Sequence, residues 1–175
     1  MSFKGLVHIY YGDGKSKSCG AFGLVFRCAG RGHRVVAAQF LKGRESGEVL
    51  ATERFEEITV LATGMEKFTF SMTDQELEEL RKTCLRVFRD SVALAEQEPA
   101  RLLVLDEVID ACVYDFLPID ELVAFLKSRP PELEIVLTGH SLPEWLSPFG
   151  DYISNVRKEK HPFDLGINGR ESIEY

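Results

Sequence analysis

The chain has 175 residues, 45% of them hydrophobic, and a formal net charge of -7 at pH 7. This length allows one sizeable core and is short for two independent domains, so we predict a single domain over residues 1–175. The negative charge argues against a nucleic acid partner, because affinity for the phosphate backbone depends on clustered Lys and Arg. There is no apolar run of about 20 residues and no basic, hydrophobic leader, so we expect no membrane span and a cytoplasmic protein.

The first 62 residues predict three strands and one helix. The run at 6–10 is short and rich in β-branched and aromatic residues, and it enters the glycine-rich segment GDGKSKS, which indicates a buried strand followed by a loop. Apolar residues recur at helical spacing over 18–29, and two glycines then end the helix. Further strands are expected over 34–40 and 58–62, with the polar stretch 41–55 forming a surface loop between them.

The rest of the chain continues to alternate helices and strands. Thr73 and Glu76 have the spacing of a capping box, and the apolar residues behind them predict the longest helix, which Pro99 ends. Pro118 suits the first position of another helix. Strands are expected over 101–108, 134–138 and 152–156, and a short helix over 143–146.

This alternation predicts an α/β fold, in which a mostly parallel sheet has helices on both faces. In such sheets ligands bind at the carboxyl ends of the strands. Four segments are therefore expected to meet around one edge of the sheet: the glycine-rich segment, Gln39 to Lys42, Asp106 with Glu107, and Thr138 with Gly139.

The loop between the first strand and the first helix contains the parts of a phosphate-binding cradle. Gly12 and Gly14 allow backbone amides to approach an anion, the helix N-terminus adds positive potential, and Lys17 can reach phosphate oxygens. The hydroxyl of Ser18 is a candidate ligand for Mg²⁺. The common pattern GxxxxGK[ST] requires glycine at two positions where this chain has other residues, so a solvated glycine-rich turn is an equal alternative on composition alone.

Asp106 and Glu107, which end the strand LLVLDE, form the second candidate group. A nucleotide site needs a carboxylate near Mg²⁺, and we expect it on a strand adjacent to the one that enters the glycine-rich loop. The alternative is a pair of hydrated acids at a strand end. The phosphate-type loop upstream favours the nucleotide site, but neither motif identifies a reaction.

Seven segments distributed over nearly the whole chain carry a family resemblance: GLVHIYYGDGKSKS, RVVAAQFLKG, KFTF, LLVLDEV, YDFLPIDEL, SRPPELEIVLTG and KHPFDLGINGRESIEY. In this order they resemble the bacterial ATP:corrinoid adenosyltransferases of the BtuR, CobO and CobA type. The resemblance implies a single RecA-like P-loop domain, usually a homodimer, whose phosphate loop is a shortened variant. It also implies a reaction in which the 5′-deoxyadenosyl group of ATP moves to Co(I) of a corrinoid and triphosphate is released.

The substrates implied by this resemblance are ATP with Mg²⁺ and a corrinoid, either cobalamin or cobyrinic acid a,c-diamide, in adenosylcobalamin synthesis or salvage. An electron donor that reduces Co(II) to Co(I) is the implied partner. Because Co(I) is itself the nucleophile, the protein needs no strong general base. Its tasks are to hold the triphosphate and the metal in line for displacement and to make the cobalt reducible.

The resemblance assigns roles to the loop and the acids, residue by residue. The residues expected to contact ATP are Gly12, Asp13, Gly14, Lys15, Ser16, Lys17, Ser18 and Cys19. Lys17, Ser18 and Glu107 are the expected catalytic residues, because they would hold the triphosphate and its metal. Ser18 and Glu107 are the expected Mg²⁺ ligands, with Asp106 in support.

The segment FTF resembles the FTW motif of the family, whose aromatic pair packs against the lower corrin face and favours a four-coordinate cobalt. The resemblance therefore assigns Phe68 and Phe70 to corrinoid binding, where phenylalanine keeps an apolar plate but lacks the size and the N–H of tryptophan. The alternative is that both side chains belong to the core. The glycine and polar residues around them favour an exposed lid.

Two residues depart from the family's phosphate loop, GNGKGKTT. Ser16 replaces a glycine, and if the backbone there requires a positive φ, the serine costs roughly 1–2 kcal/mol and weakens ATP binding. Cys19 replaces a threonine, and beside Lys17 at a helix N-terminus it is a candidate for thiolate character. Two alternatives to the adenosyltransferase follow: a non-catalytic corrinoid- or nucleotide-binding paralogue with a degraded P-loop, and an ATPase or kinase on the same scaffold.

The remaining cysteines and the histidines have no metal-binding spacing, and no CxxC pair is present, so reduced thiols are expected. Cys28 and Cys84 occupy apolar positions of predicted helices, which favours core packing. The histidines are expected to be structural or at the surface. His161 is an exception, since it lies in the family-like segment KHPF beside Lys160, a candidate nucleotide contact.

Overall fold

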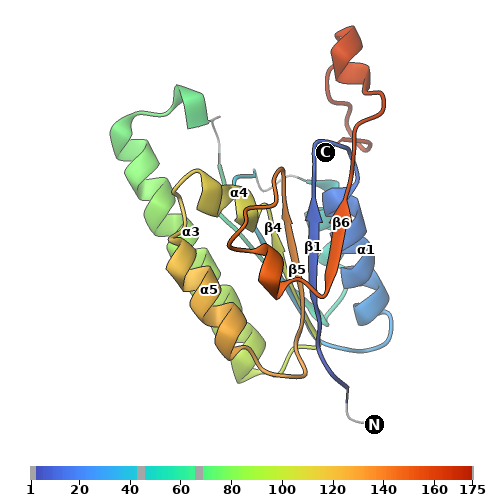
Figure 1. Ribbon diagram of the computed structural model, residues 1–175. Helices are drawn as coiled ribbons and strands as arrows, with labels where there is room; N and C mark the ends of the chain where they lie inside the picture. Colours follow the sequence, from blue (N-terminus) through green and yellow to red (C-terminus); the bar gives the residue numbers. More distant parts are fainter. Residues whose placement is uncertain (1–2, 43–45, 66–68, 175) are drawn as a thin grey trace.

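The computed structural model describes residues 3–42, 46–65 and 69–174. Six strands form one sheet in the order β3-β2-β4-β5-β1-β6, and all of the strand pairings are parallel (Figure 1). The α/β class and the parallel sheet are confirmed, and the fold is consistent with the predicted RecA-like class. The strands are β1 (Val7–Tyr11), β2 (Val35–Gln39), β3 (Ile58–Ala62), β4 (Leu102–Asp106), β5 (Glu134–Gly139) and β6 (Tyr152–Asn155).

Helices connect the strands, and two of them were not predicted. The helices are α1 (Lys17–Ala29), α2 (Gly47–Thr52), α3 (Asp74–Gln97), α4 (Val108–Val113) and α5 (Ile119–Ser128), with 3-10 turns η1 (Thr69–Ser71), η2 (Ser147–Phe149) and η3 (Pro162–Leu165). The surface loop over 41–55 was wrong where α2 forms, and α4 follows directly on a strand that was predicted to reach residue 108. The short helix expected at 143–146 is a turn that leads into η2.

The predicted capping box begins the longest helix, α3. The Thr73 hydroxyl accepts the backbone N–H of Glu76 at 3.3 Å, and the Glu76 carboxylate accepts the backbone N–H of Thr73 at 2.8 Å. Two donors that the first turn cannot pair internally are thereby satisfied. No helix in the described part of the chain combines the length and the apolar character that a bilayer crossing needs.

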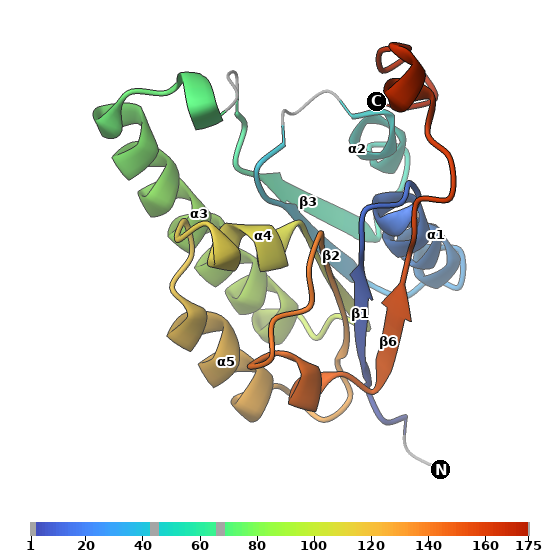
Figure 2. The same cartoon turned by 45° about the horizontal axis from the view of Figure 1, so that its top comes forward.

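Two apolar clusters cover the two faces of the sheet, and the inner strands divide their side chains between them. On β2, Val35 and Ala37 pack toward α1, whereas Val36 and Ala38 face the helices α3, α4 and α5. Figures 1 and 2 show α1 and α2 on one side of the sheet and the other three helices opposite. Cys84 is fully buried in the cluster that faces α3, α4 and α5, as predicted, and Cys28 is half-buried against the cluster that faces α1.

Because all the strands are parallel, their carboxyl ends lie at one edge of the sheet. The register places Gln39 beside Asp106 on neighbouring strands and Tyr10 beside Thr138. The chain after β6 returns over the same edge, where the tail stands above α1 and the loop after β1 (Figure 2). The four predicted segments therefore meet at this edge, which confirms the expectation.

Candidate active site

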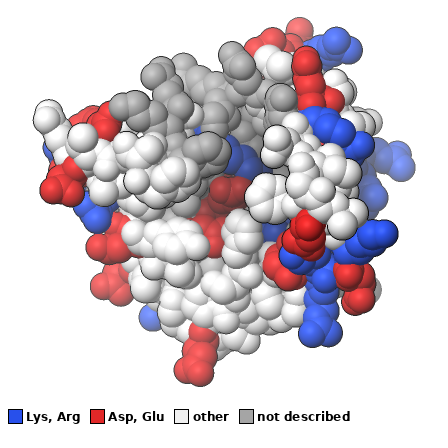
Figure 3. Space-filling model, turned by 90° about the horizontal axis from the view of Figure 1, so that it is seen from above, with Lys and Arg blue, Asp and Glu red and all other residues white. Residues whose placement is uncertain are grey.

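A cavity of about 540 Å³ opens at the carboxyl edge of the sheet, a volume typical of small-molecule sites. Seen from this edge, acidic and basic side chains meet in a hollow of the surface (Figure 3). The lining residues are Asp13, Gly14, Lys15, Ser16, Lys17, Ser18, Cys19, Lys42, Ser46, Glu48, Glu107, Thr138, His140, His161, Ile173 and Glu174. All the predicted ATP contacts except Gly12 therefore line one cavity.

The backbone of the glycine-rich loop is left-handed at Ser16. Its φ is 98° and its ψ is 2°, so the loop requires the conformation in which the family carries a glycine. Ser16 is also the residue that precedes α1, and its side chain makes no capping hydrogen bond. The first amides of α1 are thus left to an incoming ligand, as in helix N-terminal anion sites.

Gly12 and Gly14 are glycines because the chain after β6 passes against them. A Cβ at Gly12 would overlap the carbonyl oxygen of Val156, and one at Gly14 would lie 2.8 Å from the backbone of Arg157. The Gly14 N–H donates to that Val156 oxygen at 2.8 Å. The Gly14 amide is therefore occupied by the returning chain, and the role of these glycines in ATP contact stays a prediction.

The same returning chain holds Asp13. Its carboxylate accepts the backbone N–H of Lys158 at 3.0 Å, and this hydrogen bond is the main reason that the pKa of Asp13 is lowered. Asp13 lines the cavity, but in this arrangement it holds the tail against the loop. The contact of Asp13 with ATP stays a prediction.

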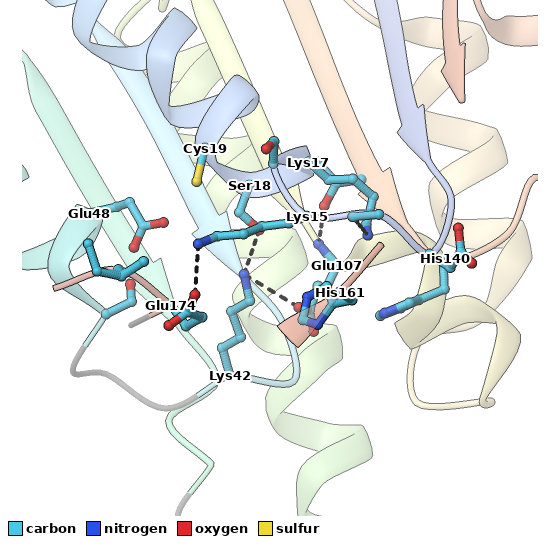
Figure 4. A pocket seen from close by; sticks show the side chains of 16 residues that line it. Lys15, Lys17, Ser18, Cys19, Lys42, Glu48, Glu107, His140, His161 and Glu174 are labelled. Carbon is cyan, nitrogen blue, oxygen red and sulfur yellow. Dashed lines mark hydrogen bonds and ion pairs between the residues drawn. The ribbon is translucent and has the colours of Figure 1, made fainter. Parts of the chain in front are cut away.

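Two lysines of the loop point in different directions (Figure 4). The Lys17 ammonium donates to the carbonyl of Gly14 at 3.0 Å, and burial lowers its pKa despite the nearby carboxylates. The Lys15 ammonium pairs with the Glu174 carboxylate in the tail at 3.0 Å. Lys17 therefore lies over the loop itself, where a phosphate would bind, and Lys15 lies toward the tail.

The acid pair at the end of β4 is separated from the strand that enters the loop, β1, by one strand, β5. The expectation of an adjacent strand was therefore wrong. Thr138 on β5 makes the connection: its hydroxyl donates to Asp106 at 2.7 Å and accepts the backbone N–H of Glu107 at 2.8 Å. Gln39 donates to the other Asp106 oxygen at 3.2 Å. Asp106 is fully buried and held in place from both sides.

Lys42, which was not predicted as a site residue beyond its place at this edge, joins the acid pair to the loop. Its ammonium lies 2.6 Å from the Ser18 hydroxyl, 2.8 Å from Asp106 and 3.4 Å from Glu107. Burial lowers the pKa of Lys42, but the attraction and hydrogen bonds of both carboxylates outweigh it, and the pKa is raised overall. Burial raises the pKa of Glu107, which the cation partly offsets.

The same three oxygen donors fit Mg²⁺. Ser18, Asp106 and Glu107 already converge on one cation, and hydroxyl and carboxylate oxygens are the ligands that Mg²⁺ prefers. Among the described residues, no group of three or more His, Cys, Asp or Glu could hold a metal by itself. The site therefore has the donors for a metal that brings further ligands with it, as a nucleotide-bound ion does.

Two histidines line the cavity, and one of them was expected to be structural or at the surface. His140 follows β5, and its ring Nδ1 lies 3.0 Å from the buried Asp110 of α4. This hydrogen bond is the main reason that the pKa of His140 is raised. His161 also lines the cavity, and its Nδ1 accepts the N–H of Phe163 at the start of η3. Lys160 is exposed and is not among the lining residues.

Comparison with known proteins identifies the family. The family described as ATP:corrinoid adenosyltransferase BtuR/CobO/CobP matches residues 3–175. The chain belongs to this family. The Corrinoid adenosyltransferase of Escherichia coli (strain K12) and the Corrinoid adenosyltransferase CobA of Salmonella typhimurium (strain LT2) are each 30% identical over 98% of this chain and 86% of their own. The Corrinoid adenosyltransferase of a Sinorhizobium species is 31% identical over 98% of this chain and 81% of its own.

Membership in the adenosyltransferase family makes this chain an enzyme of that kind. The aromatic pair expected at the corrinoid is Phe68 and Phe70. Phe70 lies in η1 and is 86% exposed, so the core alternative is wrong for this residue. Phe68 lies outside the described residues. Among the described residues, Phe70 is not part of the lining of the cavity described above.

Proposed function

We propose that this adenosyltransferase moves the 5′-deoxyadenosyl group of ATP to Co(I) of a corrinoid and releases intact triphosphate. The observation that carries the proposal is the meeting of Lys17 and the free end of α1 with the acid pair Asp106 and Glu107 around one cavity. Cationic and amide donors suit the phosphates, and the carboxylates suit their metal. The family supplies the class of reaction.

In this proposal the protein acts by binding and orientation. Lys17 and the amides of α1 hold the triphosphate, while Ser18 and Glu107 would hold Mg²⁺, with Asp106 fixed behind them by Thr138. Bound Mg²⁺ would neutralise phosphate charge. An electron pair of Co(I) forms the bond to C5′ as the C5′–O bond breaks, and the triphosphate leaves with the two electrons of the broken C5′–O bond. No proton has to be removed, so the proposed reaction needs no general base at C5′.

The corrinoid side of the proposal rests on the aromatic segment and on the resemblance. The exposed ring of Phe70 supplies an apolar surface of the kind that can cover a corrin face, and Phe68 is its proposed partner. The corrinoid is cobalamin or cobyrinic acid a,c-diamide. A homodimer, a cytoplasmic location and an electron donor that reduces Co(II) are further parts of the proposal.

An anaerobic assay with Co(I) cobalamin, Mg²⁺ and ATP tests the reaction. We expect the absorption spectrum of a cobalt–carbon bond to appear and one triphosphate to be released for each corrinoid consumed. Release of ADP or inorganic phosphate without alkylation would favour the ATPase or kinase alternative. No product at saturating ATP, from protein that is folded and binds MgATP, would overturn the proposal.

A second candidate is a non-catalytic nucleotide- or corrinoid-binding protein, and the backbone at Ser16 is the observation that favours it. The left-handed φ of 98° is strained for a residue with a side chain, so the native loop carries a cost that the family's glycine avoids. The double variant Ser16→Gly, Cys19→Thr restores the loop of the family. If the variant alkylates Co(I) rapidly and the native protein does not, the second candidate is correct.

A further inference from the structure

The ammonium of Lys42 lies among the oxygens that are proposed to bind magnesium. It approaches Ser18 at 2.6 Å, and Glu107 lies 3.4 Å away (Figure 4). The carboxylate of Asp106 lies 2.8 Å from the same ammonium. The Lys42 side chain is 27% exposed and that of Asp106 is fully buried. One positive charge of the protein therefore offsets part of the negative charge of the acid pair and contacts the serine at the same time.

A divalent ion cannot enter this arrangement without moving the lysine. Two cations in contact with one carboxylate pair repel each other strongly at such distances in a partly buried site. Moreover, Mg²⁺ takes six oxygen ligands, and three oxygens of the described residues surround the ammonium here, so water would have to supply the rest. The free ion thus gains few protein contacts to offset the loss of the ammonium.

A triphosphate changes this balance, because it supplies both the missing metal ligands and a new partner for the lysine. Lys42 lines the same cavity as Lys17 and the loop, so its long side chain has phosphate oxygens within reach once the cavity is filled. Asp106 would keep its position when the ammonium leaves, since Gln39 and Thr138 still donate to its two oxygens.

We propose that Lys42 is an internal substitute for the metal, which keeps free Mg²⁺ out of the nucleotide-free protein and yields its place only when the ion arrives with a triphosphate. The proposal rests on the proposed function, because it takes a metal–nucleotide complex as the natural ligand. It assigns Lys42 two positions: between Ser18 and the acid pair before binding, and on a phosphate oxygen afterwards.

The test uses the full chain without nucleotide or corrinoid and measures Mn²⁺ binding by electron paramagnetic resonance. We expect Lys42→Met to bind one Mn²⁺ at least about tenfold more tightly than the native protein. Lys15→Met is the matched control, because it also removes a positive charge from the cavity. The native Lys15 pairs with Glu174 and not with the acid pair, so this variant should bind Mn²⁺ as the native protein does. Lys42→Gln, which is polar and uncharged, should reproduce the gain if the methionine variant folds poorly.

Two further arms localise the site and separate the proposals. Adding Glu107→Gln to Lys42→Met should abolish the gain, and tripolyphosphate added to the native protein should create a Mn²⁺ site. Equal Mn²⁺ affinity in the native and both Lys42 variants, or a gain that survives Glu107→Gln, would overturn the role of Lys42. Absence of alkylation in the cobalamin assay would instead overturn the proposed function. The Mn²⁺ affinities measured without nucleotide would still test whether Lys42 excludes the free ion.

Discussion

The carboxylate of Asp110 holds His140 by both its backbone and its ring. The backbone N–H of His140 lies 3.1 Å from each Asp110 oxygen, and the ring Nδ1 lies 3.0 Å from one of them. Asp110 is buried because α4 packs directly on Gly139, where a Cβ would lie 2.5 Å from Ile109. A glycine at the end of β5 thus permits a charged pair at the rim of the cavity.

This pair predicts a pH dependence of stability. The Asp110 hydrogen bond, ahead of the opposing effect of burial, raises the pKa of His140 above its ordinary value of about 6.5, with Glu107 adding to the rise and Lys17 opposing it. Protonated His140 therefore stabilises the fold fully below about pH 6.5, and this contribution is lost as the pH rises through the higher pKa of the folded state. We expect the Tm of the native protein to exceed that of His140→Gln most at acidic pH, with the difference shrinking as the pH rises through the raised pKa of the folded state.

Thermal melts at closely spaced pH values measure this difference, and Asp110→Asn is the control. Because the asparagine variant keeps a hydrogen-bonding side chain but carries no charge, the difference caused by His140→Gln in that background should be small and flat. A difference between native protein and His140→Gln that does not change with pH would contradict the prediction.

Ser16→Gly should stabilise the protein. Glycine removes the left-handed penalty of roughly 1–2 kcal/mol but adds freedom to the unfolded chain, so we expect a net gain of about 0.5–1 kcal/mol in the free energy of unfolding. Ser46→Gly is the control, because Ser46 has an ordinary φ of -73° and donates a hydrogen bond to Gln39. Urea denaturation should show the control losing stability. A loss in both variants would mean that the Ser16 backbone is not strained.

Gly12→Ala should be strongly destabilising, by about 2 kcal/mol or more, because the methyl group meets the Val156 carbonyl and φ at Gly12 is 120°. Gly23→Ala is the matched substitution, since Gly23 lies inside α1 with no neighbouring atom within 4 Å of a built Cβ. There alanine should stabilise by roughly 0.5–1 kcal/mol. The two unfolding curves should move in opposite directions, and a harmless Gly12→Ala would show that the tail does not pack on the loop.

The thiols should differ sharply in reactivity. Cys19 is exposed in the cavity, whereas Cys84 and Cys112 are buried, and burial raises the pKa of each of these two to about 12. Since the thiolate is the reactive form, brief treatment with iodoacetamide should modify Cys19 and spare the buried pair. Mass spectrometry of peptides reads this directly. Tripolyphosphate should slow the modification of Cys19, and equal rates with and without it would argue against a phosphate seat beside α1.

Local patterns predicted the elements that are long or have a strong local signal. Apolar periodicity and the Thr73–Glu76 capping box located α3, because these interactions are made within a few residues. The short helices α2 and α4 were missed for the opposite reason. Six residues carry too little periodicity to be recognised, and such helices depend on packing against the sheet, as Val49 of α2 does.

By itself the sequence determined the α/β class, the family and the loop that lines the cavity, because these follow from the order and chemistry of neighbouring residues. Only the tertiary structure decided which acidic and basic side chains far apart in the sequence pair with each other: Lys42 with Asp106, Asp110 with His140, and Lys15 with Glu174. It also showed that Gly12 and Gly14 admit the returning chain. Such pairings depend on strand order and on the path of the tail, and no spacing along the chain encodes them.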